Sequence, residues 1–328
     1  MKWAEPKSFA IIFISLVASC LSSVAAAQSF PARPIRIVVP FPGGSVVDTY
    51  TRMLAEHMVP ALNGQAIIVE PRSGAGTEVG TKYVLSQPAD GYTLLMITPA
   101  FAVKASLPKP AWDARRDVAV VGGMFDSSQI LAIRASLPFK TVKELVDFAK
   151  ANPGKLNMVN YGVGTQGHLS GELLMYKAGA QAASIPYNGA VAAALALSQG
   201  NGDFGFNAAS ALMPFAQQGK VRLLAASTAQ RDPAMPDIPG MAESGIKDFN
   251  VASWGGLLAP AGTPKTIVMQ LNSAMGAGMK AQPVRMLLKS QGIFLNENVS
   301  SPEAFAQEIY ATVDEFSQLI RNANLQLE

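Results

Sequence analysis

The strongest constraint on the fold is the regular alternation of short apolar runs with helical patterns that begins after residue 34. Apolar runs at 35–39, 66–70 and 92–98 are separated by stretches with helical spacing at 48–62 and 78–85. This strand–helix–strand–helix–strand order is typical of a parallel sheet covered by helices on both faces. The first part of the chain is therefore predicted to form an α/β unit.

A second series of the same kind begins at residue 129. The run at 129–134 is followed by a capping box, Thr141 to Glu144, which opens a helix. Further strands are predicted at 156–160 and 221–227 and further helices at 168–178 and 192–198, while the run at 254–260 is the last predicted strand.

The two series are joined by extended crossings, and the C-terminal part can return to the first series. We therefore expect two lobes around a cleft, one made of residues 29–127 and 251–328, the other of residues 128–250. The final helix is expected to begin at Ser301-Pro302 and to bury one apolar side.

The N-terminus has the pattern of an export signal. Lys2 and Lys7 flank the start of an apolar run at 8–21, which is shorter than the roughly 20 residues that a transmembrane helix needs. Small residues follow, and cleavage is predicted after Ala27, which would release the mature chain into the periplasm. The alternative is a lipoprotein signal in which Cys20 is lipidated.

Composition excludes several functional classes. The chain is 49% hydrophobic and 15% charged, with a formal net charge of +3 and no run of basic residues, so nucleic acid is not an expected partner. One cysteine cannot form a disulfide within the chain or a cysteine-based zinc site. No serine-hydrolase, zinc-protease or P-loop signature occurs, so we expect neither an enzyme nor a bound cofactor or metal.

Three predicted strand-to-helix junctions are rich in glycine. They lie at 41–45, 73–77 and 162–167, each directly before a predicted helix. The start of a helix offers unpaired backbone N–H groups and partial positive charge, and glycine lets an anion approach them closely. Hydroxyls that could donate to a carboxylate are contributed by Ser45, Ser73, Thr77 and Thr165. For any one junction, a tight turn without ligand contact explains the glycines equally well.

The third junction also matches the dinucleotide-binding pattern G-x-G-x-x-G. The acidic residue expected about 20 residues later is missing, because that segment reads Ile-Pro-Tyr-Asn-Gly. The match alone does not support a nicotinamide enzyme.

Several polar and aromatic residues allow two interpretations each. His168 could donate to a ligand or cap and pack its helix, and Asp203 could bind a polar ligand group or hold a turn. Asp48 is expected to stabilise its loop, His57 to be structural, and Trp254 to lie in the core or on a cleft wall.

Taken in order, the motifs resemble a known family. Its landmarks here are RPIRIVVPFPGG, VEPRSGAGTEVG, ADGYTLL, KANPGKLN, YGVGTQGHLSGELL, IPYNGAVAAALAL, MPDIPGMAESG and WGGLLAPAGTP. From about residue 31 to the C-terminus, the chain resembles the Bug-type periplasmic solute-binding proteins of tripartite tricarboxylate transporters.

The resemblance implies a two-lobed, type II periplasmic binding protein fold with a ligand cleft between the lobes. It also implies a monomer that captures a small carboxylate by lobe closure and passes it to membrane permease subunits. The ligand-binding residues it implies are Phe41, Pro42, Gly43, Gly44, Ser45, Val46 and Val47 of the first junction, Gly74, Ala75, Gly76 and Thr77 of the second, Gly164, Thr165, Gly167 and His168 of the third, and Tyr187, Asn188 and Asp203 near the far end of the ligand.

The chain departs from the family pattern in its first two junctions. Ser45 stands where the family has its second glycine, and Val46 and Val47 precede Asp48. The second junction departs at Pro71, Ser73 and Thr77. The expected ligand is a small carboxylate, either aromatic or a dicarboxylate. The valines indicate an apolar lining, which favours an aromatic or longer aliphatic carboxylate. The alternative functions are an exported α/β enzyme acting on a small carboxylate and a periplasmic sensor partner.

Overall fold

The computed structural model describes residues 30–233, 235–290, 293 and 301–325. The predicted signal segment, with both the cleavage site after Ala27 and the alternative lipid site at Cys20, lies outside these residues. Among the helices that are described, none combines the length and the apolar character that crossing a membrane requires.

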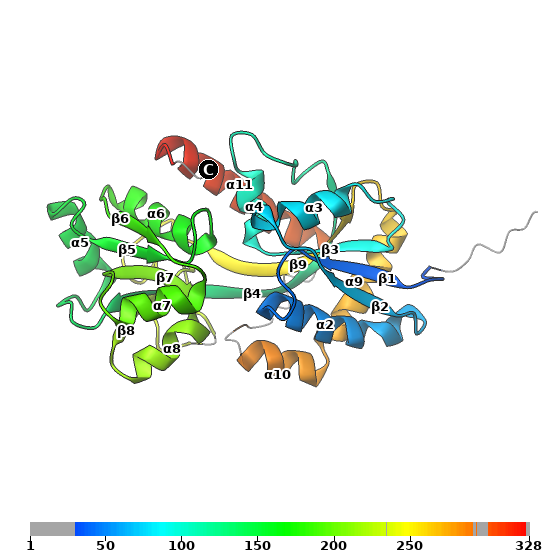
Figure 1. Cartoon of the computed structure of the whole chain (residues 1–328), viewed down its shortest axis with the longest axis horizontal. Coiled ribbons are helices and arrows are strands. Elements are labelled where there is room, and N and C mark those ends of the chain that lie inside the picture. Colours follow the sequence, from blue (N-terminus) through cyan, green and yellow to red (C-terminus); the bar gives the residue numbers. More distant parts are fainter. Residues whose placement is uncertain (1–29, 234, 291–292, 294–300, 326–328) are drawn as a thin grey trace, which may run out of the picture.

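The described strands form one continuous sheet in the order β2-β1-β3-β9-β4-β7-β5-β6, with β8 paired to β4 (Figure 1). Their bounds are Ile35–Val39 (β1), Ile67–Pro71 (β2), Thr93–Ile97 (β3), Val118–Arg134 (β4), Asn157–Asn160 (β5), Ala183–Pro186 (β6), Phe204–Ala208 (β7), Val221–Ala226 (β8) and Ala252–Pro260 (β9).

Helices cover the sheet in two groups, which lie on the right and left of Figure 1. The first group is Val46–Met58 (α2), Val59–Leu62 (η1), Ala75–Thr77 (η2), Glu78–Leu85 (α3), Pro99–Ala105 (α4), Lys265–Met279 (α9) and Gln282–Ser290 (α10). The second group is Val142–Ala151 (α5), Gln166–Ala178 (α6), Ala190–Ser198 (α7) and Ala209–Gln217 (α8). The last helix, α11 (Pro302–Asn322), lies against both groups.

The parallel strand pairing predicted from the sequence is confirmed in each half of the sheet. β1 pairs in parallel with β2 and β3, and β5 pairs in parallel with β6 and β7. The sheet as a whole is mixed, because β9 is antiparallel to β3 and β4, and β4 is antiparallel to β7 and β8. Strand β4 leads out of the first half of the molecule and β9 leads back into it, so these two neighbouring strands run in opposite directions.

Strand β4 joins the two groups. It has 17 residues, which span roughly 56 Å at the usual rise of a strand. Val118 to Ser128 pair with β9, and Gln129 to Arg134 pair with β7 and β8. The sequence prediction placed only the last part of this strand, from residue 129. Its first part contains Gly122 and Gly123 and two register shifts, which weaken the alternating pattern of a strand.

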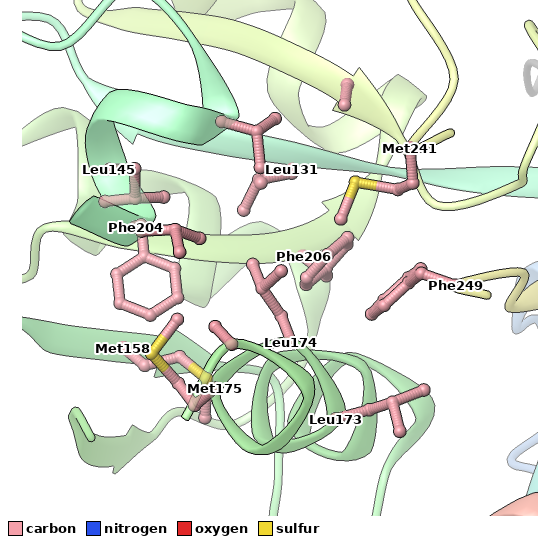
Figure 2. Close-up of a cluster of buried hydrophobic side chains, with 14 of the residues drawn as sticks. Leu131, Leu145, Met158, Leu173, Leu174, Met175, Phe204, Phe206, Met241 and Phe249 are labelled. Atoms are coloured by element: carbon pink, nitrogen blue, oxygen red, sulfur yellow. The ribbon is translucent and has the colours of Figure 1, made fainter. Parts of the chain in front are cut away.

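Apolar clusters lie in both halves of the molecule. In the middle segment, Phe204 and Phe206 pack with Leu131, Met158 and residues of α6, as Figure 2 shows. The ring of Phe249 stacks on Phe206 with centroids 5.6 Å apart. The residue boundaries predicted for the two lobes stay predictions, since the sheet runs without a break through both.

Helix α11 contributes to clusters in both halves. Phe305, Ile309 and Val313 pack with residues of β3, α4 and β9, whereas Phe316 and Leu319 pack in the cluster of the middle segment. The predicted apolar side of this helix is confirmed, because all of its residues are buried: Phe305, Ile309, Val313, Phe316 and Ile320.

On the same helix, Glu308 faces β4 near Asp126. Burial raises the pKa of Glu308 from 4.5 to about 8, and the nearby Asp126 carboxylate contributes to the rise. The folded state therefore favours the protonated form of Glu308 at the place where α11 meets β4.

This shift predicts a pH dependence of stability. Because the folded pKa lies above the unfolded one, the contribution is fully present below about pH 4.5 and is lost as the pH rises toward about 8. We expect the Glu308→Gln variant, which keeps a neutral side chain, to gain thermal stability relative to the unmodified protein as the pH rises from about 5.5 to about 8.5. Thermal melts across this range check it, with the exposed Glu303→Gln on the same helix as control. Parallel melting curves for Glu308→Gln and the unmodified protein would contradict it.

Candidate functional site

The first glycine-rich junction connects β1 to α2 and is held by its own residues. Ser45 is the N-cap of α2, and its side chain accepts a hydrogen bond from the backbone N–H of Asp48. The Asp48 carboxylate accepts from Gly44 N at 2.9 Å and from Arg52 Nε at 3.0 Å. Burial opposes ionisation of Asp48, but these hydrogen bonds outweigh it and the pKa is lowered. Asp48 therefore stabilises the loop, as expected from the sequence.

The second junction connects β2 to α3 through an unusual backbone. Four successive residues, Gly74 to Thr77, have positive φ angles, including 144° at Gly74 and 60° at Gly76. A Cβ added at Gly76 would lie 2.9 Å from Cε of Lys104, so glycine lets this lysine cross the loop closely. Thr77 is 5% exposed, and its hydroxyl has no hydrogen-bond partner among the described residues.

The third junction connects β5 to α6 and is closed by internal hydrogen bonds. The Thr165 hydroxyl donates to Gly162 O at 2.6 Å and accepts from His168 N at 3.5 Å, as an N-cap does. His168 accepts from Gly164 N through Nδ1 at 3.2 Å, and its Nε2 lies 3.5 Å from Glu172. These contacts fit the interpretation that His168 caps and packs its helix, rather than the one in which it donates to a ligand.

The first and second junctions of one half and the third of the other face a common cleft with two adjoining pockets. The first pocket has a volume of about 750 Å³ and the second about 500 Å³. Four residues line both pockets, namely Val47, Thr98, Tyr161 and Ser253. The walls come from both groups of elements and from the joining strand β9, so the cleft lies between the two halves.

Ten of the residues implied by the resemblance line this cleft. They are Phe41, Pro42, Val46, Val47, Gly74, Ala75, Gly76, Thr77, Gly164 and Thr165. The others do not line either pocket: Gly43, Gly44, Ser45, Gly167, His168, Tyr187, Asn188 and Asp203. Gly43, Gly44 and Ser45 shape the first junction. A Cβ at Gly167 would meet the Tyr161 ring, so this glycine is required for packing.

Asp203 has a structural role. Its carboxylate accepts from Arg134 Nε at 2.8 Å and from Asn157 N at 2.7 Å, which ties β4 to β5. Tyr187 directs its hydroxyl to Asn201 O at 3.3 Å. Neither Asp203 nor Tyr187 lines the cleft. Gly189, close to Tyr187 in the sequence, lines the first pocket.

Lys104 is a cleft residue that the sequence prediction missed. It lies half-buried in the last turn of α4 and lines the first pocket. It is the one charged side chain among the described residues that line the two pockets. The available signal was a single lysine in the apolar segment PAFAVKA directly after a strand.

A hydrogen-bond network among residues that line the cleft was also missed. Gln166 Nε2 donates to Ala252 O at 2.6 Å, which turns its Oε1 toward Nε2 of Gln129 at 3.4 Å. The same Gln129 nitrogen donates to the Tyr161 hydroxyl, which also accepts from Gly167 N at 3.0 Å. Burial raises the pKa of Tyr161 to about 12, so its O–H proton is retained at neutral pH. Within the described part of the chain, no cluster of three or more His, Cys, Asp or Glu residues could hold a metal ion.

Thr77 and Thr165 give a matched pair of variants. Thr77→Val removes an unpartnered hydroxyl from the cleft, and we expect it to weaken carboxylate binding roughly ten- to a hundredfold, because a hydrogen bond to a charged group contributes about 1.5–3 kcal/mol. Thr165→Val removes a helix cap, and we expect a lower melting temperature with about 1 kcal/mol lost. Calorimetric titration with the best carboxylate from a thermal-shift screen, together with apo melting curves, separates the two. A loss of affinity confined to Thr165→Val would reverse these assignments.

Comparison with known proteins shows the family to which the chain belongs. Residues 50–325 match the tripartite tricarboxylate transporter family receptor. Protein BugT of Bordetella pertussis is 29% identical over 97% of this chain and 98% of its own length. The periplasmic binding protein BugD shares 32% identity and a TM-score of 0.73, over 90% of this chain and 99% of BugD. MatC from Rhodopseudomonas palustris, solved with bound malate, shares 29% identity and a TM-score of 0.73, over 89% of this chain and all of the matched chain (100%).

The match covers most of the sequence, and the similar structures have the same two-lobed α/β arrangement around a cleft. This chain therefore belongs to the receptor family of the tripartite tricarboxylate transporters, whose members are solute-binding proteins.

Proposed function

We propose that this protein is an extracytoplasmic receptor that captures a small carboxylate in the cleft and passes it to the membrane permease subunits of a tripartite tricarboxylate-type transporter. The single observation that carries the ligand class is Lys104, the one charged group among the described lining residues of the cleft.

The surroundings of Lys104 leave its charge available to a ligand. Glu78 interacts with Lys104 electrostatically, but Glu78 forms its ion pair with Lys82, at 2.5 Å. The Lys104 side chain lies beside Gly76 of the second junction. Thr77, whose hydroxyl has no partner among the described residues, lines the same pocket. An anion in the first pocket gains a charge-assisted hydrogen bond from Lys104 and a second donor from Thr77.

The comparisons support the same ligand class and the same cellular role. MatC was solved with malate, a dicarboxylate, and BugD is a periplasmic binding protein. The signal pattern at residues 1–27 supports export, with cleavage after Ala27. We place the mature protein in the periplasm on these two grounds.

Replacing Lys104 tests the proposal. Lys104→Met keeps most of the side-chain length but removes the charge, and we expect carboxylate affinity to fall roughly ten- to a hundredfold. The control is Lys109→Met, an exposed lysine that does not line either pocket. Isothermal titration gives both affinities. Equal affinities in Lys104→Met and the unmodified protein would remove the argument for an anionic ligand.

Apolar side chains at the cleft edges predict closure around the ligand. Val46 of the first half is 50% exposed, while Val163 and Val191 of the other half are 52% and 71% exposed, although all three line the pockets. Bringing the halves together would bury this surface and exclude water from the ligand. We expect the radius of gyration from small-angle X-ray scattering to fall at saturating ligand. An unchanged scattering profile, with binding confirmed by titration, would rule closure out.

A further inference from the structure

The second pocket differs in chemistry from the first. None of its described lining residues carries a charge. Tyr50, Phe125 and Trp254 lie in its wall as buried aromatic side chains, and the Tyr50 and Phe125 rings meet edge to face with centroids 5.2 Å apart. A ligand that reaches from the first pocket into the second therefore meets an uncharged, partly aromatic wall.

Two polar atoms of this pocket are buried without a hydrogen-bond partner among the described residues. They are the hydroxyl of Tyr50, a residue 3% exposed, and Oε1 of Gln129, a residue 4% exposed. Native proteins rarely leave such groups unpaired, because burial removes their hydrogen bonds to water and no protein group replaces those bonds. Both residues line the second pocket, which places a bound molecule beside them.

The orientation of the Gln129 amide follows from its neighbours. Gln166 must direct its Nε2 to the carbonyl of Ala252, so its Oε1 faces Gln129 and requires a donor there. Gln129 supplies that donor with its own Nε2, which leaves Oε1 as the unpaired atom. Oε1 can only accept, and so it requires a ligand group that donates a hydrogen bond.

We propose that the second pocket binds the uncharged, hydrogen-donating end of the ligand, a hydroxyl or a primary amide. The ligand is then a monocarboxylate with a neutral polar group at its far end. This inference rests on the proposed function, in which the carboxylate occupies the first pocket beside Lys104.

Other far-end groups fit the pocket less well. A second carboxylate cannot donate to Gln129 Oε1 and would be buried without a cation, and an ammonium group would meet no acidic side chain among the described lining residues. An alkyl end would leave Tyr50 and Gln129 unpaired. A hydroxyl or amide can donate to Gln129 and accept from Tyr50 without carrying charge.

A set of ligands matched in shape tests this inference on the full mature protein. The set comprises the dicarboxylates from succinate to suberate and terephthalate, the monoamide of each, and the analogues in which an isopropyl group replaces the amide. At the chain length that binds best, we expect the monoamide to bind at least roughly tenfold more tightly than the dicarboxylate or the isopropyl analogue. Isothermal titration measures all three.

Tyr50→Phe locates the effect in the second pocket. It removes the unpaired hydroxyl and keeps the ring, so the apo protein should melt at the same temperature or higher, while monoamide affinity falls roughly five- to tenfold. Affinity for the isopropyl analogue should not change. The control is Thr81→Val, which removes another buried, unpaired hydroxyl that does not line the cleft and should leave every affinity unchanged.

The outcomes separate the two proposals. If a dicarboxylate or an isopropyl analogue binds as tightly as its monoamide, or if Tyr50→Phe binds the monoamide as well as the unmodified protein does, this inference is wrong and the carboxylate receptor stands. If the monoamides bind through the amide alone, with no loss in Lys104→Met, the proposed function fails and this inference fails with it.

Discussion

The continuity of strand β4 is the constraint on which the rest of the structure depends. Its hydrogen bonds change partner between Ser128 and Gln129, from β9 of one half to β7 and β8 of the other. Side chains of these same two residues line the second pocket. The point at which the sheet passes from one half to the other is therefore also part of the cleft wall. A ligand in this pocket would lie against the joining strand itself, so the closure proposed above would act on the same segment of backbone.

Beside the joining strand, hydrogen bonds hold the halves at a defined position. Ser128 donates to Asp232 through both its N–H and its hydroxyl, and Ser227 links Gln129 to Val251. These contacts join β4 to the segment that leads into β9. The cleft is thus backed by hydrogen-bonded strands, while its edges carry exposed valines. Such a division between a hydrogen-bonded base and apolar edges suits a site that admits a small molecule and then encloses it.

Local patterns in the sequence were sufficient for much of the fold, and ten of the eighteen residues predicted to bind the ligand line the cleft. The three glycine-rich junctions each form the predicted turn before a helix, and all three reach the cleft. Long-range contacts were not predictable in this way. Gln129 enters the cleft because distant strands pair beside it, and nothing within a few residues of it indicates this. For Lys104 the local sequence offered only a lone lysine in an apolar helix, which does not show that the helix faces a cleft. Thr165 shows a different limit, because a helix-capping threonine and a ligand-binding threonine have the same local sequence. The first part of β4 was missed because its glycines interrupt the strand pattern.

Helix α11 also determines how the chain can fold. Phe305 completes an apolar cluster of one half and Phe316 completes a cluster of the other, yet both belong to the last element of the chain. Each half therefore contains one apolar cluster that is complete only when the C-terminal helix has docked. The two halves, which look like separate modules in outline, share this last helix in their packing. An excised middle segment would expose the surface that Phe316 and Leu319 normally cover, and would be prone to aggregate.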